Sequence, residues 1–251
     1  MQLAEALTGE VAKYLETRDT VMIPSGSLEQ HWMAAPLGCD TIIPVRLCRA
    51  AGDRTGTAVA PAVSYGLSEN HMGFAGTVSL RRETLSHITR DVVTSLYFHG
   101  FRKMLFISGH GGNRKPIEDG FEEASGECPG ALMEYRLYRD LPGAVEKHRD
   151  LFCPDPGYHV TVTEVSMIWH LLGCEMPVFP RVKFPPEPSP GEVLGSKEWL
   201  ERYPQGGAGS DLGFVSVEKG GVFFEFLVDS LCGYLGELEK DTVSPFESET
   251  T

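Results

Sequence analysis

The sequence lacks the features of a secreted disulfide scaffold and of a membrane protein. Its six cysteines are spread over 251 residues and none lies in a Cys-x-x-Cys pair, so we expect no disulfide framework. The most apolar stretch, VFFEFLVDSLCGYL, is too short for a membrane span and is interrupted by Glu225 and Asp229. The N-terminal segment MQLAEALTGEVAKYLE has no basic region followed by an apolar run, which predicts the absence of a signal peptide. We therefore expect a cytoplasmic protein without a membrane partner.

Positive charge is also scarce. The chain has 22 Lys and Arg against 35 Asp and Glu, a formal net charge of −13, and no basic cluster. Such a surface does not attract nucleic acid, so we expect no nucleic-acid partner. The phosphate-loop patterns G-x-x-x-x-G-K and G-x-G-x-x-G are absent, which disfavours a metal-free sugar- or nucleotide-binding α/β domain. Without a repeat or a linker-like stretch, we expect one domain over residues 1–243 and a disordered tail over residues 244–251.

Strand-like and helix-like segments alternate along the chain. Apolar runs predict buried strands at residues 20–26, 57–66, 103–109 and 131–137. Apolar residues at helical spacing predict helices over residues 3–17, 40–52, 83–98, 113–125, 163–172 and 218–238. The Pro- and Gly-rich region 183–217 is expected to form long irregular loops. The alternation predicts an α/β fold with a parallel sheet covered on both faces, where ligands bind beyond the carboxyl ends of the strands.

The polar cluster SLEQH follows the first predicted strand. Glu29 and His31 lie two residues apart on an extended segment, so their side chains point the same way. A carboxylate oxygen and an imidazole nitrogen together suit Zn, Mn or Fe. An ordinary surface loop is the alternative for this pair. Asp40, at the start of the next predicted helix, is explained equally well as an N-cap.

The segment GHGGN directly follows the third predicted strand. Three glycines around His110 cost chain entropy unless the backbone needs unusual angles, and they let the side chain project from the strand end. The alternative is a tight turn that carries a histidine facing solvent. The position between a strand and a helix favours a site.

Three further residues lie in polar segments near predicted strand or helix ends. Glu164 precedes the apolar helical run VSMIWHLL, where the helix dipole alone also favours an acidic residue. His159 lies five residues earlier and has the alternative of an ordinary, partly buried histidine. His71 lies in the polar loop SENHMGFAGT after the second predicted strand and is a further candidate.

Taken together, two histidines and three acidic residues can supply two metal ions with one shared carboxylate. Two ions about 3.5–4 Å apart can bridge a water, convert it to hydroxide near neutral pH and polarise a carbonyl. Hydrolysis of an amide also needs a proton for the leaving nitrogen, and we expect His159 to donate it.

These segments resemble the motifs of the creatininase family. PSGSLEQHWMAAPLGCD resembles the family pattern P-x-G-S-x-E-Q-H-G-x-H-x-P-x-x-T-D, and ISGHGGN resembles N-G-H-G-G-N. YGLSENHMGFAGTVSL resembles Y-G-x-S-x-E-H-x-x-F-x-G-T-x-S, HVTVTEVS resembles H-A-G-x-x-E-T-S, and VEKG resembles a late E-K-G. They follow the family's order from about residue 24 to residue 220.

The resemblance implies a three-layer α/β/α sandwich with a mainly parallel central sheet. It also implies two divalent metal ions per chain (Zn, Mn or Fe), hydrolysis of cyclic or linear amides by a metal-bridged hydroxide, and a homohexamer built as three dimers. It places Glu29 and His110 on one metal, His31 and Glu164 on the other, and Asp40 between them. His159 would lie beside the metals as an acid or a substrate ligand.

The chain departs from the family pattern at several positions around these residues. The departures are Trp32 for Gly, Ala34 for a second His, Cys39 for Thr, and Val160, Thr161 and Val165 in the HVTVTEVS segment. Trp32 is expected to narrow the pocket and, with His71 and Gly111, to contact the substrate.

The departures bear on the substrate more than on the metals. Creatininase carries Glu where this chain has Gly112, and it uses tryptophans in a segment where residues 137–158 contain none. Creatinine is therefore disfavoured, and a small molecule with an amide, cyclic amide or formamide bond is expected. The alternatives are a peptidase-like member acting on a short modified peptide, and a binding protein that has lost turnover.

Overall fold

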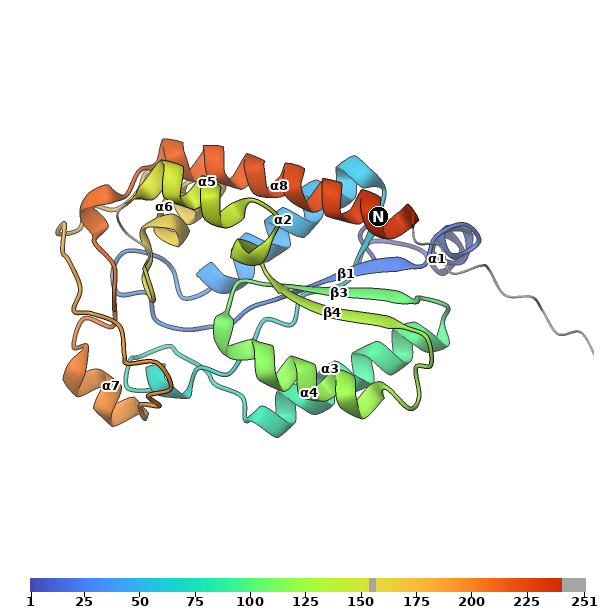
Figure 1. The fold of residues 1–251 in the computed structure, drawn as a ribbon, viewed down its shortest axis with the longest axis horizontal. Coiled ribbons are helices and arrows are strands. Elements are labelled where there is room, and N and C mark those ends of the chain that lie inside the picture. The colour runs from blue at the N-terminus through green and yellow to red at the C-terminus, as the bar shows by residue number, and fades with distance from the viewer. Residues whose placement is uncertain (154–156, 241–251) are drawn as a thin grey trace, which may run out of the picture.

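A four-stranded parallel sheet forms the centre of the structure, in the order β2–β1–β3–β4 (Figure 1). The computed structural model describes residues 1–153 and 157–240. The strands are β1 (Thr20–Ser25), β2 (Ala58–Val59), β3 (Lys103–Ser108) and β4 (Leu132–Leu137). In the β1–β3–β4 register, Ser25 pairs with Ser108 and Ser108 with Leu137, so these three strands end at one level. The loops that follow them therefore start side by side.

Helices cover both faces of the sheet, which confirms the predicted α/β sandwich (Figure 1). One face carries α3 (Arg82–Phe98) and α4 (Arg114–Ala124). The other carries α2 (Cys39–Thr55), α5 (Ala144–Phe152), α6 (Val162–Leu172) and α8 (Val217–Lys240). The helix α1 (Thr8–Leu15) lies beyond the amino ends of the strands and α7 (Ser196–Arg202) beyond their carboxyl ends. Short 3₁₀ turns lie at η1 (Glu69–His71), η2 (Gly111–Asn113), η3 (Tyr138–Asp140) and η4 (Leu212–Phe214).

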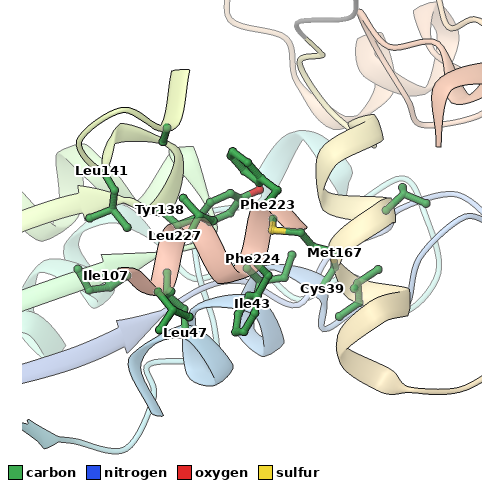
Figure 2. Close-up of a cluster of buried hydrophobic side chains, with 14 of the residues drawn as sticks. Cys39, Ile43, Leu47, Ile107, Tyr138, Leu141, Met167, Phe223, Phe224 and Leu227 are labelled. Carbon is green, nitrogen blue, oxygen red and sulfur yellow. The ribbon is translucent and has the colours of Figure 1, made fainter. Parts of the chain in front are cut away.

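The central strands are buried on both faces, which explains their continuous apolar sequences. In β1, Met22 packs towards α2, α6 and α8, whereas Val21 and Ile23 pack towards α3 and α4. In β3, Leu105 and Phe106 divide in the same way, because successive side chains in a strand point to opposite faces. Figure 2 shows the first of these cores, in which side chains of α2, α6 and α8 meet those of β3 and η3.

Phe223 of α8 tests this core most directly. Its side chain is fully buried and its ring lies edge-on to that of Phe152. Phe223→Ala is expected to lower the free energy of unfolding by about 3–5 kcal/mol, because it removes buried apolar surface and leaves a cavity. The neighbouring Val222→Ala, at a side chain that is 47% exposed, should stay within about 0.5 kcal/mol. Denaturant unfolding measures both, and equal losses would contradict the described packing.

The second predicted strand and the first predicted helix differ from the structure. The run at 57–66 forms a ladder only at Ala58–Val59, because Pro61 has no N–H to donate, and later residues make single bridges such as Ser25 with Val63. The helix expected at 3–17 begins only at Thr8, because Leu3 N donates to Val59 O at 2.8 Å and holds the N-terminal segment extended.

Two helices were absent from the sequence prediction. The helix α7 lies within the region expected to be irregular, and Trp199 is its only buried residue, so it shows no apolar periodicity. The helix α5 buries only Ala144 and Phe152. The tail 244–251 lies outside the described residues. Of the helices that the structure describes, none is long and apolar enough to cross a membrane.

Candidate metal centre and active site

The candidate site lies where β1 and β3 end against the start of α2. Gly109 N donates to Ser25 O at 3.0 Å, which ties the two strand ends together. A Cβ on Gly26 would lie 2.3 Å from Asp40 O, and one on Gly109 would lie 2.1 Å from the same atom. These two glycines therefore let both strand ends approach the start of α2. A side chain at either position would force the backbone to move.

Asp40 occupies the centre of the cluster. Its Oδ1 lies 3.3 Å from His31 Nε2 and its Oδ2 lies 3.1 Å from His110 Nδ1. Ser27 Oγ donates to Oδ2 at 2.8 Å, and the residue is only 4% exposed. The N-cap of α2 is Gly38, so the capping explanation for Asp40 is wrong. One carboxylate faces two histidines from its two oxygens.

Two outer carboxylates complete the arrangement. Glu29 Oε2 lies 3.3 Å from His110 Nδ1, and Glu164 Oε1 lies 3.9 Å from His31 Nε2. Glu164 also forms a capping box with Thr161 at the start of α6, so its place at a helix end is compatible with its place in the cluster. The cluster thus has two halves that share Asp40.

Side-chain atoms that could bind a metal ion lie close together in this cluster. The ligand atoms of Glu29, Asp40 and His110 lie within 4.8 Å of one another. Two further groups meet this limit: His31 with Cys39 and Asp40, and Glu29 with His31 and His159. The buried Cys39 thus lies beside the half that holds His31.

Backbone carbonyls orient both central histidines. His31 Nδ1 donates to Glu29 O at 3.1 Å, and His110 Nε2 donates to Leu67 O at 2.9 Å. The other ring nitrogen of each histidine then faces the carboxylates, as is usual for metal-binding histidines. His31 Nε2 and Glu29 Oε2 are buried without a hydrogen-bond partner. Buried polar atoms rarely lack a partner, so these two atoms fit ligands of a bound cation.

The glycines of GHGGN have different roles. A Cβ on Gly112 would lie 2.5 Å from His110 Nε2 and 2.7 Å from Leu67 O, whereas one on Gly111 meets nothing closer than Arg139 Nη2 at 3.9 Å. Asn113 fastens the loop, since its Oδ1 accepts from Leu67 N and its Nδ2 donates to Gly26 O.

Gly112→Ala is expected to lower metal affinity about 10–100-fold, the usual effect of disturbing an outer hydrogen bond of a histidine ligand. The added methyl group must displace the His110 ring from Leu67 O. Competition against a chromogenic chelator measures the affinity, and Gly111→Ala is the matched control that should leave it unchanged. Equal affinities for the two variants would show that the contact with Leu67 does not orient the ring.

A second group of side chains lies beside the cluster. Gln30 Oε1 accepts from Trp32 N at 2.9 Å, which assigns its Nε2 as the donor that lies 3.1 Å from His71 Nδ1. The rings of His71 and His159 stack at 4.1 Å between centroids. His159 Nε2 lies 3.0 Å from Gln30 O and 2.9 Å from Gln30 Nε2, while its Nδ1 lies 3.6 Å from Glu29 Oε1. The Nδ1 side of the His159 ring therefore faces the cluster.

Burial and neighbouring charges raise the pKa of some histidines of the site and lower the pKa of others. Burial disfavours ionised Asp40, yet His31 and His110 hold the pKa of this carboxyl well below its usual range. Burial also lowers the pKa of His31, but the carboxylates, Asp40 first, outweigh it and raise this pKa to about 10. In contrast, burial keeps the pKa of His159 well below its usual range. The carboxylates thus favour positive charge at His31 and His110, and they would favour a bound cation for the same reason.

A cavity of about 540 Å³ opens directly on these groups. Its lining includes Glu29, Asp40, His71, His110, Gly111, Tyr158, His159, Glu164 and Trp199. Trp32 is not among the described residues that line this cavity. Its ring packs edge-on against Phe179 and Phe184. At φ 50° Trp32 keeps the left-handed backbone that favours glycine, the residue usual at this position, while its side chain turns away.

Several residues of the site were not found from the sequence. Gln30 and Asn113 lie inside the recognised motifs, and their amide side chains were the available signal. Ser27 lies in the SLEQH cluster, but nothing local shows that its hydroxyl reaches Asp40. Arg139 and Trp199 carried no local signal, because only the fold brings them to the cavity.

The structure defines an α/β protein with a buried carboxylate–histidine cluster at the carboxyl edge of a parallel sheet. The chain belongs to the creatininase family, since the family model described as creatinine amidohydrolase matches residues 4–235. A solved creatininase superposes with a TM-score of 0.85 and 25% identity, covering 96% of this chain and 98% of that one. A manganese creatininase gives a TM-score of 0.84 at 25% identity, covering 94% and 98%.

Curated relatives share the family but differ in their named activities. Creatinine amidohydrolase of Pseudomonas putida is 31% identical over 143 residues, covering 54% of this chain and 52% of the relative. A mycofactocin precursor peptide peptidase of Mycobacterium tuberculosis is 35% identical over 165 residues, covering 62% and 59%. A 3-dehydro-scyllo-inosose hydrolase of Thermotoga maritima is 33% identical over 103 residues, covering 41% and 33%. The matches thus span between a third and three fifths of these relatives, and all three names describe hydrolases.

Proposed function

We propose that this chain is a metal-dependent hydrolase that cleaves an amide, cyclic amide or formamide C–N bond of a small molecule. The observation that carries the proposal is Asp40, which presents one oxygen to His31 and the other to His110 in a buried cluster. Glu29, His110 and Asp40 would hold one divalent ion, and His31, Glu164 and Asp40 the second. Zn, Mn and Fe all suit this nitrogen and oxygen set, and solved creatininases of 25% identity include manganese and zinc–zinc forms.

The chain's own residues would position the substrate and move protons. When bound, two divalent ions supply a Lewis acid for the carbonyl and make a water nucleophilic near neutral pH. His159 is neutral and has Nδ1 facing the cluster, so it can accept the proton of the attacking water and return it to the leaving nitrogen. The stacked ring of His71 and the Gln30 carbonyl hold the imidazole of His159 in this orientation.

A short modified peptide is the second candidate substrate. The peptidase relative of Mycobacterium tuberculosis favours it, and the cavity is of the size usual for small ligands. A binding protein that has lost turnover is the third reading, since HVTVTEVS departs from the family pattern. All three share one metal centre and differ in what the cavity accepts.

Metal removal and reconstitution test the proposal. Stripping the protein with a chelator should abolish hydrolysis, and Zn, Mn or Fe should restore it on at least one member of a panel containing creatinine, lactams, formamides and short peptides. Creatinine is expected to be a poor member of this panel. Restored metal without hydrolysis of any member would favour the binding protein, and cleavage of peptides alone would favour the peptidase.

The assembly and location follow from the resemblance and belong to the same proposal. We expect one domain over residues 1–243, a homohexamer and a cytoplasmic location. Light scattering on the purified full chain measures the oligomer, and a mass other than six chains would contradict that part.

A further inference from the structure

Arg139 lines the cavity next to the glycine loop that carries His110. It lies in η3, directly after the carboxyl end of β4, the level at which the loops of β1 and β3 form the metal cluster. Its Nη2 lies 3.9 Å from the position that a Cβ on Gly111 would take, so the guanidinium lies over the glycine loop next to His110. No side chain at Gly111 separates the two.

Arg139 is exposed, and its charge interacts electrostatically with the Glu164 carboxyl in the same cavity. It is the one Lys or Arg among the residues described as lining the cavity, and no hydrogen bond or ion pair to it is found there. Asp140, its neighbour in sequence, pairs with Arg114 at 2.5 Å, and Glu192, which also lines the cavity, pairs with Arg202 at 2.7 Å. A planar guanidinium left free beside a cavity is suited to binding a carboxylate through two parallel hydrogen bonds.

The rest of the outer wall combines apolar side chains with polar ones such as Asn70 and Glu192. Val193 and Leu194 line the cavity, with Val193 93% exposed, and the rings of Tyr158 and Trp199 stack there at 6.3 Å between centroids. Glu69, exposed on η1, is an acidic residue at the same rim. A ligand that fills this space would present an apolar part to these side chains and its anionic part to Arg139.

We propose that Arg139 binds a carboxylate of the substrate, so that the chain acts on an amide bearing a carboxylate near the scissile bond, as in an N-acyl amino acid. The identity of the reacting bond rests on the proposed function. The contact between Arg139 and the carboxylate does not, because it involves no metal ligand.

Equilibrium binding to the metal-loaded protein tests this contact. N-acetyl-L-valine and N-acetyl-L-valinamide differ only in the carboxylate, and calorimetry gives a Kd for each. The wild-type chain should bind the carboxylate form about ten- to a hundredfold more tightly, the usual size of a charged hydrogen-bonded contact. Arg139→Gln should abolish this preference and leave the Kd of the amide unchanged. Arg46→Gln, at an exposed arginine of α2 outside the cavity lining, should keep the preference.

Two outcomes would overturn the assignment. A wild-type chain that binds both probes equally, or neither, has no carboxylate site at Arg139. A preference that survives in Arg139→Gln would mean that the metal ions, and not Arg139, hold the carboxylate. Metal content and hydrolysis of N-acetyl-L-valine are measured on the same preparations, so that a failure of the proposed function is seen separately from a failure of this contact.

Discussion

Asp40→Asn is expected to empty both metal positions and to lower kcat/KM at least about a thousandfold, because two-metal hydrolysis needs both ions in place. The substitution keeps the shape of the side chain but removes the charge that faces His31 and His110 at 3.3 and 3.1 Å. Substitution of a ligand that belongs to one half would leave the metal position of the other half intact, whereas Asp40 contributes an oxygen to both halves. Elemental analysis and steady-state kinetics measure the two effects.

The matched control is Asp140→Asn, the same substitution at a side chain that is 42% exposed and paired with Arg114. It should leave metal content and kcat/KM unchanged, since exposed ion pairs contribute little. An Asp40→Asn protein that retains one full equivalent of metal would show that the two halves do not share this carboxylate.

His159→Ala should lower kcat about 10²–10⁴-fold, the range for loss of a general acid–base group. Metal content should not change, because His159 is placed beside the metals and not between the two halves. Its Nδ1 lies 3.6 Å from Glu29 Oε1, close enough to serve a reacting group that replaces water in the cavity. Single-turnover kinetics on the metal-loaded protein separate the chemical step from substrate binding.

His99→Ala, at an exposed histidine after α3, is the control and should behave as the wild type. If His159→Ala instead loses metal in step with activity, then His159 is a ligand, as its grouping with Glu29 and His31 also permits.

The secondary structure of the sheet was largely predictable, but the register was not. Apolar runs located β1, β3 and β4, since strands buried on both faces need continuous apolar sequence. The matched ends at Ser25, Ser108 and Leu137 depend on pairing across distant segments, which no local pattern encodes. The helix α7 was missed because Trp199 alone anchors it.

The residues of the candidate metal cluster were predictable from the sequence, but their arrangement in space was not. Glu29, His31 and His110 stood out because ligand types follow strands in glycine-rich or extended segments. The position of Asp40 between two histidines depends on the tertiary structure, because at the level of sequence the helix start offers an N-cap explanation. For Trp32 the sequence predicted a pocket residue, because it lies next to the candidate ligand His31. In the structure its backbone is left-handed and its ring lies against Phe179.

The metal content of the purified chain, measured by elemental mass spectrometry beside His110→Ala, tests the central claim most directly. His110 is one of the two histidines that face Asp40, and its other nitrogen is held by Leu67 O at 2.9 Å. We predict close to two transition-metal ions per wild-type chain and fewer in the variant. A wild-type chain that contains no metal, and retains none after reconstitution, would contradict the two-metal mechanism and leave only the fold.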